Sequence, residues 1–213
     1  MKKTTAIRRQ ELVQTAYHLM TGRGINSITT KELARLNGIS EAAIYRHFAS
    51  KHEIFMALLD GVEKELFHTI GEAADSQRAS LDKLRAIMQA HMNFTQRHKG
   101  GIFVITAECI HMRDKTFKQK LLGVISRYIA TIKAVLAQAQ KENVINRDID
   151  IESASMMFYS LIQVAAINYV LTDYKVKPIS TFKTMWNVFI RGVERDELIG
   201  TEVLPQKAVK VRR

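Results

Sequence analysis

The sequence contains one cysteine, two prolines and ten glycines in 213 residues. A single cysteine, Cys109, excludes an internal disulfide, and so little proline and glycine excludes a loop-rich chain. The alternation of apolar and polar residues that marks β-strands is nearly absent, whereas apolar residues recur at helical spacing. The sequence therefore predicts an all-α protein. The first five residues are basic and lead into a charged segment, not an apolar one, so we expect no signal peptide and a cytoplasmic location.

The longest apolar run covers residues 154–171, where fourteen of eighteen residues are apolar. Its length approaches that of a membrane span. Ser155, Ser160, Gln163 and Asn168 interrupt it, however, and no second run resembles it. We therefore expect a helix buried on every side of a soluble core and no membrane association.

Positive charge is concentrated at the two ends of the chain. The formal net charge is +11, and residues 1–55 hold nine Lys and Arg against four Asp and Glu. Residues 56–205 are nearly neutral, with nineteen bases against seventeen acids, whereas residues 206–213 add four bases and no acid. An excess of positive charge near the N-terminus favours binding to a polyanion such as DNA. The last eight residues are expected to form a basic disordered tail.

The first helix is marked by an apolar stripe. Leu12, Ala16 and Leu19 recur at helical spacing. Gly22 and Gly24 follow, and glycine readily adopts the left-handed conformation at a helix C-terminus. We therefore expect the helix to end there.

Two capping boxes and one glycine turn then divide the chain into short helices. Residues 29–32 (Thr-Thr-Lys-Glu) form the first box, in which the threonine and the glutamate satisfy each other's free amides. That helix ends at Asn37 and Gly38, and Ser40 caps a further helix over residues 41–48. Residues 50–53 (Ser-Lys-His-Glu) form the second box and begin a much longer helix. The pattern predicts a helix-turn-helix with a flanking helix on each side.

The rest of the chain predicts five more helices. Ser80 and Asp150 are expected to cap two of them, and Pro178 is expected to precede the last. The predicted ranges are 80–98, 101–112, 115–141, 151–172 and 180–198. We expect a DNA-binding domain over 1–50, a helical ligand-binding and dimerisation domain over 51–205, and the tail over 206–213.

The second helix of the helix-turn-helix has one face suited to reading DNA. Ile44 and Phe48 are expected to point inward. At 100° per residue, the opposite side carries Ala42, Ala43, Tyr45 and Arg46. Small residues permit close approach to the major groove, where a methyl group can contact thymine. The helix N-termini at Thr29, Ser40 and Ser50 offer free amides to phosphate oxygens, with Lys51 beside the last of them.

These segments resemble the DNA-binding signature of the TetR family of regulators. The similarity covers about residues 6–66 and is carried by residues 28–34 (Ile-Thr-Thr-Lys-Glu-Leu-Ala), 38–40 (Gly-Ile-Ser), 44–48 (Ile-Tyr-Arg-His-Phe) and 50–51 (Ser-Lys). The resemblance implies a three-helix DNA-binding domain, a helical dimerising domain and a small-molecule pocket.

Functional residues of the family can be placed by position in this chain. Tyr45 and Lys51 match positions that contact phosphates in the family, and Thr30 lies at a cap position that often contacts phosphate too. Positions 41–43 and 46 correspond to the surface that reads the bases. Residues 41–43 (Glu-Ala-Ala) depart from the glycine or threonine of many members, so the operator sequence cannot be inferred. The full set of expected DNA contacts is Thr29, Thr30, Lys31, Ser40, Glu41, Ala42, Ala43, Tyr45, Arg46, His47 and Lys51.

Soft and aromatic side chains are frequent in the middle of the chain. They suit an adaptable pocket for a small apolar or amphipathic effector, and they suit a helical core equally well. The pocket is therefore an expectation from the resemblance alone. Its proposed lining is Met88, Met92, Phe103, Met112, Phe117, Tyr128 and Met157.

The sequence gives little support for a metal site or for catalysis. Glu108, Cys109 and His111 lie close together, and His91 and His98 precede them, but no second pair repeats at ligand spacing. No glycine-rich phosphate loop and no nucleophile in a recognisable setting appear. We expect no metal, no cofactor and no enzymatic activity.

The C-terminal helices are expected to join two subunits. Ranges 151–172 and 180–198 would form a four-helix interface, with Phe182, Trp186, Phe189 and Val193 as a stripe facing the partner. The homodimer would bind a near-palindromic operator, with half-sites ~34–36 Å apart, and an effector would release it. The alternative is a DNA-bound scaffold that recruits a protein, because residues 40–48 also resemble the recognition helix of TetR-type nucleoid-occlusion factors.

Overall fold

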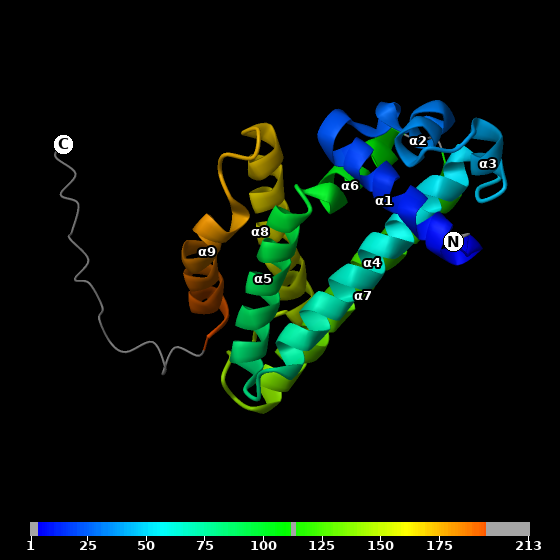
Figure 1. Ribbon diagram of the computed structural model, residues 1–213. Helices are drawn as coiled ribbons and strands as arrows, with labels where there is room; N and C mark the ends of the chain where they lie inside the picture. Colours follow the sequence, from blue (N-terminus) through cyan, green and yellow to red (C-terminus); the bar gives the residue numbers. More distant parts are fainter. Residues whose placement is uncertain (1–3, 112–113, 195–213) are drawn as a thin grey trace.

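The computed structural model describes residues 4–111 and 114–194, of which the side chains of Ile25, Glu108 and His111 are left undescribed, and these residues form helices and turns (Figure 1). The helices are α1 (Thr5–Arg23), η1 (Ile25–Ser27), α2 (Thr30–Asn37), α3 (Glu41–Tyr45), α4 (Lys51–Asp75), α5 (Ser80–Arg97), α6 (Gly101–His111), α7 (Lys115–Lys141), α8 (Ile151–Leu171) and α9 (Pro178–Val193). Within this part of the chain, the only β-type pairing is an isolated bridge between Ile145 and Glu194. The all-α prediction is confirmed.

The molecule has a small N-terminal end and a larger helical body. Figure 1 shows α1, α2 and α3 together at one end, while α5, α7, α8 and α9 form the body. The long helix α4 leads from the first group into the second. Helix α5 is central to the body, because it packs against α4, α7, α8 and α9.

Helix α8 is not buried on every side, contrary to the sequence prediction. Phe158 and Ile162 face the core and are fully buried. On the opposite side, Met156 is 53% exposed, Val164 is 49% exposed and Leu171 is 75% exposed. The prediction was wrong because α5, and not α8, occupies the centre of the body. Helix α8 therefore presents a strip of exposed apolar side chains.

The aromatic stripe on α9 also faces the other way from the prediction. Phe182, Trp186, Phe189 and Val193 are buried within their own chain. The ring of Phe189 lies 5.3 Å from that of Phe158 on α8 and 6.0 Å from that of Trp186. Helix α9 is the outermost helix of the body, so its most apolar face must cover α5 and α8. The stripe consequently cannot be the surface that meets a partner.

Several helix boundaries differ from those predicted. The residue that caps α5 is Ala79, without a side-chain hydrogen bond, and Ser80 is the first helical residue. Pro178 does not precede α9 but begins it, in the first turn, where its missing amide costs nothing. Helix α9 ends at Val193 because Glu194 adopts an extended backbone. Met112 and the predicted tail lie outside the described residues. The cap at Asp150 and the stop at Gly24 are confirmed.

Helices α7 and α8 are both long and apolar enough to cross a membrane, so the expectation that no second run resembles residues 154–171 was wrong. Each also contributes fully buried side chains to the common core, such as Ile132 from α7 and Phe158 from α8. The two helices pack against each other and against α5. The buried apolar side chains of the two helices belong to the core of the body, while others, such as Leu122 and Val164, are exposed.

Candidate functional site

The turn between α2 and α3 depends on one glycine. Gly38 has a φ of 62° and a ψ of 37°, which is the left-handed region. A side chain would be strained there, and glycine is not. The amide of the next residue, Ile39, donates to the carbonyl of Ala34 at 3.0 Å and closes the end of α2. The turn thus fixes the direction of α3 relative to α2.

Helix α3 presents its two sides as the sequence predicted. Ile44 and Phe48 are fully buried, whereas Tyr45 is 58% exposed and Arg46 is exposed. The helix is shorter than the predicted 41–48 because residues 46 and 47 form a turn. The amide of Phe48 still donates to the carbonyl of Ile44 at 3.0 Å, so Phe48 keeps its inward position.

A network that the sequence did not reveal holds the end of α3. The guanidinium of Arg9 on α1 lies 4.2 Å from the centre of the Phe48 ring. It donates to the backbone carbonyl of His47 and to the carboxylate of Glu53 on α4. That carboxylate also accepts from the amide of Ala49 at 2.7 Å. The hydrogen bonds that Glu53 accepts from the Ala49 amide and from Arg9 lower the pKa of its carboxyl group. Arg9 therefore joins α1, the turn after α3 and α4.

The three predicted caps form, but the glutamates of the capping boxes act differently. The hydroxyls of Thr29, Ser40 and Ser50 accept from backbone amides of α2, α3 and α4 at 3.0–3.3 Å. The carboxylate of Glu32 does not reach back to the cap. It accepts from Arg35 and Arg23 instead, and hydrogen bonding to Arg35 lowers its pKa to about 2. Two nearby guanidinium groups outcompete a single backbone amide for this carboxylate.

The expected DNA contacts gather at the N-terminal end of the molecule. They lie on α2 and α3, at the caps and the turn beside these helices, and at the start of α4. Figure 1 shows the three helices close together. Thr30, Ala43 and His47 are half-buried. The others are exposed: Thr29, Lys31, Ser40, Glu41, Ala42, Tyr45, Arg46 and Lys51.

One contact within this surface was not predicted. The hydroxyl of Thr30 donates to the carboxylate of Glu41 at 3.0 Å. The pair ties the start of α2 to the start of α3. It also places an acidic group on the surface that would face DNA, where a carboxylate can accept a hydrogen bond from the amino group of cytosine.

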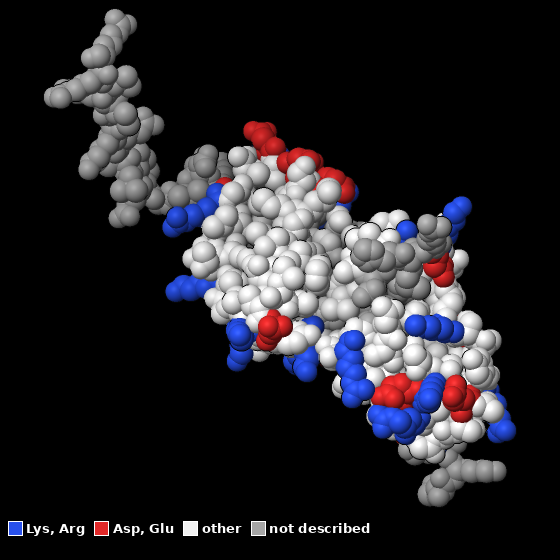
Figure 2. Space-filling view, turned by 90° about the horizontal axis from the view of Figure 1, so that it is seen from above, with Lys and Arg blue, Asp and Glu red and all other residues white. Residues whose placement is uncertain are grey.

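Basic side chains do not form a continuous stripe on the face shown in Figure 2. Several Lys and Arg side chains lie together with Asp and Glu side chains at the lower right, and another group of acidic side chains lies at the upper edge.

The N-terminal end is joined to the body by specific hydrogen bonds. The hydroxyl of Tyr17 on α1 donates to the carbonyl of His98 at 2.7 Å, and the hydroxyl of Tyr174 donates to the carbonyl of Thr21 at 2.9 Å. A β-carbon on Gly101 would lie only 2.3 Å from the Tyr17 hydroxyl. Only glycine at 101 leaves room for this contact.

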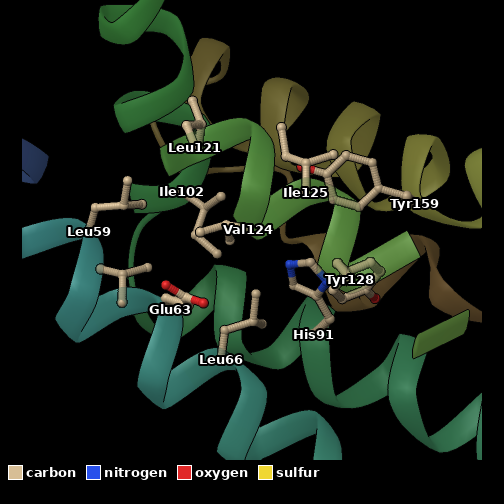
Figure 3. A pocket seen from close by; sticks show the side chains of 11 residues that line it. Leu59, Glu63, Leu66, His91, Ile102, Leu121, Val124, Ile125, Tyr128 and Tyr159 are labelled. Carbon is tan, nitrogen blue, oxygen red and sulfur yellow. The ribbon is translucent and has the colours of Figure 1, made fainter. Parts of the chain in front are cut away.

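A small apolar cavity lies inside the body (Figure 3). Its free volume is about 20 Å³, where a single water molecule needs roughly 10–15 Å³. The walls come from α4, α5, α6, α7 and α8. The lining residues are Leu59, Val62, Glu63, Leu66, His91, Ile102, Leu121, Val124, Ile125, Tyr128 and Tyr159.

The residues predicted to line one pocket lie in separate places: at two small cavities, in the core and on the surface. Tyr128 lines the cavity, and Phe103 lines a second small space beside it. Met88, Met92 and Phe117 are fully buried in the core. Met157 is 41% exposed on the outer face of α8. The sequence alone could not separate these positions, because core and pocket require the same side chains.

Two polar groups of the cavity have no hydrogen-bond partner among the described residues. They are Nδ1 of His91 and the hydroxyl of Tyr128, whose rings lie 5.0 Å apart. Burial lowers the pKa of His91 to about 3 and raises the pKa of Tyr128. Both side chains are therefore uncharged in the folded protein at neutral pH.

The low pKa of His91 predicts an acid sensitivity that one substitution should remove. An unfolded histidine has a pKa near 6.5, so the unfolded chain takes up a proton below that pH and the folded chain does not. The free energy of unfolding should therefore fall with pH below about 6.5. Between pH 7.5 and pH 5.0, His91 should account for a loss of about 2 kcal/mol.

Urea unfolding at several pH values tests this expectation. His91→Leu should lose less stability than the wild type over this range. His68→Leu on α4 is the matched control, because His68 is exposed and should leave the wild-type slope intact. An unchanged slope in His91→Leu would contradict the assignment.

Of the residues considered for a metal site, Glu108 and His111 have side chains outside the described part of the structure. Across the described residues, no three His, Cys, Asp or Glu side chains are placed to share an ion. Cys109 is buried, and burial raises the pKa of its thiol. His91 lines the cavity, and Nε2 of His98 lies 2.8 Å from Glu65.

The chain matches two family models that together cover most of its length. Residues 12–58 match the model for bacterial regulatory proteins of the tetR family. Residues 62–192 match the model for the C-terminal region of YsiA-like proteins. The two matches meet within α4, the helix that joins the N-terminal end to the body.

Individual relatives and solved structures agree with these matches. The nucleoid occlusion factor SlmA of Vibrio vulnificus (strain YJ016) is 23% identical over 180 residues, which are 84% of this chain and 92% of that protein. The regulator FadR of Bacillus subtilis, solved in complex with stearoyl-CoA, superposes with a TM-score of 0.75 at 16% identity, covering 87% of this chain and 99% of FadR. AibR, solved with isovaleryl coenzyme A and operator DNA, superposes with a TM-score of 0.69 at 15% identity, covering 85% and 97%. These likenesses to solved structures concern the fold.

Proposed function

Because the chain belongs to the TetR family of bacterial regulatory proteins, we propose that this DNA-binding transcriptional regulator is a homodimeric repressor that a small effector releases from its operator. The observation that carries the proposal is the outward face of α3. Tyr45 is exposed there and Arg46 directly after the helix, while the inward residues Ile44 and Phe48 are fully buried. A helix held this firmly can enter the major groove without rearrangement.

Roles within the surface follow from the chemistry of each side chain. Ala42, Ala43 and Arg46, with Glu41, are proposed to face the base edges, where arginine pairs well with guanine. Tyr45, Lys51 and the helix N-termini are proposed to hold phosphates. We propose residues 1–50 as the DNA-binding domain and 51–205 as the effector and dimerisation domain, acting in the cytoplasm where the chromosome lies.

Removing a phosphate contact should weaken binding to every DNA sequence alike. Lys51→Ala should lower the salt dependence of affinity by close to one ion per subunit, because one fewer counterion is released. Tyr45→Phe should weaken binding uniformly without changing that slope, because it removes a neutral hydroxyl. Fluorescence anisotropy at several salt concentrations, with several duplexes, measures both effects.

Lys141→Ala serves as the control for Lys51→Ala. Lys141 is exposed at the C-terminal end of α7. The N-terminal end of α7 lies near the start of α4, because Asp114, the residue before α7, contacts His52 on α4. A helix of this length separates its ends by about 40 Å, so the control should leave binding unchanged. A salt slope in Lys51→Ala equal to that of the wild type would remove Lys51 from the interface.

The homodimer is supported by the apolar strip on α8. Met156, Val164 and Leu171 are exposed, and Val188 on α9 is 64% exposed. Exposed apolar side chains in this number are typical of a protein interface. A second copy of the chain is the proposed partner, since one helix-turn-helix covers only half of an operator.

Release by an effector is supported by the position of α4. Leu59, Val62 and Leu66 of this helix form one wall of the cavity, and its first residues carry Lys51 and Glu53 of the DNA surface. An effector that enlarged the cavity would push α4 and move the surface it carries. The solved complexes of FadR and AibR with acyl-CoA molecules show that this fold can hold a small-molecule ligand.

A second candidate function is a DNA-bound scaffold that recruits another protein. It is favoured by the likeness to nucleoid occlusion factors over most of the chain. Chromatin profiling separates the two. A repressor should occupy a few sites near promoters, whereas a scaffold for cell division should occupy many sites spread over the chromosome.

A further inference from the structure

The cavity described above combines apolar walls with two unpaired polar groups. Nδ1 of His91 and the hydroxyl of Tyr128 are buried and have no hydrogen-bond partner among the described residues. A buried polar group without a partner costs free energy, so such groups are rare in folded proteins. Figure 3 shows His91 and Tyr128 side by side, across the cavity from Glu63.

We propose that the cavity binds a small, uncharged molecule with an apolar body and one oxygen, either a hydroxyl or a carbonyl, that pairs with Tyr128 and His91. The inference rests on the proposed release by an effector and names the chemical class of that effector. The oxygen accepts from the Tyr128 hydroxyl. A ligand hydroxyl also donates to Nδ1 of His91, whereas a carbonyl accepts from Nδ1 when this nitrogen carries the proton.

The charges around the cavity favour a neutral ligand. Among the lining residues, only Glu63 carries a charge at neutral pH, and Lys and Arg are absent from the lining. A carboxylate ligand would meet Glu63 and apolar walls with no cation to pair with. A cationic ligand would find Glu63 already engaged, since Arg127 lies 3.1 Å from its carboxylate and Lys120 lies 3.9 Å from it.

The polar groups also argue against a plain hydrocarbon. An alkyl group filling the cavity would leave both Nδ1 of His91 and the Tyr128 hydroxyl unpaired. The free volume of about 20 Å³ holds one water-sized group, so the proposal requires the walls to move apart to admit the apolar body of the ligand. The wall that links the cavity to DNA binding is α4, through Leu59 and Val62.

A matched series of six-membered rings tests the proposed chemistry. Cyclohexanol and cyclohexanone carry one neutral oxygen, methylcyclohexane carries none, cyclohexanecarboxylate is an anion and cyclohexylamine is a cation. Each is added to the full-length protein without DNA, and the shift in Tm is measured up to about 10 mM. At least one of the neutral oxygen compounds should raise Tm and bind at least about 10-fold more tightly than the other three.

Two substitutions test the proposed partners. Tyr128→Phe and His91→Leu should each weaken binding of the neutral oxygen compound by about 10-fold. Without ligand, Tyr128→Phe should raise Tm by about 2–6 °C, because it removes an unpaired buried hydroxyl. Tyr174→Phe is the matched control. Its hydroxyl has a partner in the carbonyl of Thr21, so this change should lower Tm and leave ligand binding unchanged.

Several outcomes would overturn the proposal. The first is that methylcyclohexane or cyclohexanecarboxylate binds with an affinity equal to that of cyclohexanol and cyclohexanone. A fall in Tm for Tyr128→Phe would show that the hydroxyl has a structural role, such as holding a water. The proposal would also fail if none of the compounds in the series shifted Tm. Binding of the neutral oxygen compound without any effect on DNA affinity would instead overturn release by an effector and leave the ligand chemistry intact.

Discussion

Replacing Val164 and Val188 together by glutamate is expected to convert the protein to a monomer and to abolish specific DNA binding. Both side chains are exposed and apolar, on α8 and α9. In a dimer built on these helices, two carboxylates per subunit would be buried without partners. A single subunit contacts one half-site, so the affinity for the operator should fall by at least about 1000-fold, toward that for non-specific DNA.

Sedimentation velocity at micromolar concentration and fluorescence anisotropy measure the two effects. The matched control is Leu122→Glu on α7, where an equally exposed apolar side chain (62%) lies on another helix. It should remain dimeric and bind DNA normally. Circular dichroism should show that both variants stay folded. A dimeric double variant, or a wild type that sediments as a monomer, would contradict the assigned interface.

Arg46→Ala is expected to change which operator the protein selects. The side chain is exposed in the turn directly after α3, whereas Ile44 of that helix is buried. Losing a base contact should cost about 1–3 kcal/mol at the contacted base pair, which is about a 5- to 150-fold loss of discrimination there. Affinity for unrelated DNA should change little by comparison.

Lys51→Ala is the matched comparison, because it also removes one positive charge from the same surface. Binding-site selection with both variants distinguishes the roles. Arg46→Ala should relax or alter the consensus at one or two positions of each half-site. Lys51→Ala should return the wild-type consensus at lower affinity. If both variants returned the wild-type consensus, Arg46 would not be a base-reading residue.

The helix-turn-helix could be predicted from the sequence because its signals are local. Thr29, Ser40 and Ser50 cap helices through amides only three residues ahead, and Gly38 meets a backbone requirement at its own position. The inward direction of Ile44 and Phe48 follows from helical periodicity alone. Such features depend on neighbours along the chain, which a sequence displays directly.

Contacts between distant residues could not be predicted in the same way. Arg9 reaches Glu53 across 44 positions, and Tyr174 reaches Thr21 across 153. Nothing in the local pattern around either residue indicates its partner. The carboxylate of Glu32 shows the same limit, since the expected bond to its own cap is replaced by pairs with Arg23 and Arg35.

The orientation of the C-terminal helices was predicted incorrectly for a related reason. An apolar stripe shows that one face of a helix is buried, but not what covers it. The stripe on α9 packs against its own chain, and α8, which had been expected to be buried on every side of the core and also to meet a partner, exposes one apolar face within the subunit. His91 likewise appeared to be a candidate metal ligand, because a sequence does not show that its ring lies in an apolar cavity beside Tyr128.

Selection of binding sites from random duplex DNA by the purified wild-type protein tests the central claim most directly. If the protein is a dimeric operator-binding regulator, the enriched sequences should contain two inverted half-sites whose centres lie ~34–36 Å apart, or a multiple of one helical turn. Enrichment of no sequence, or of a single isolated half-site, would contradict it.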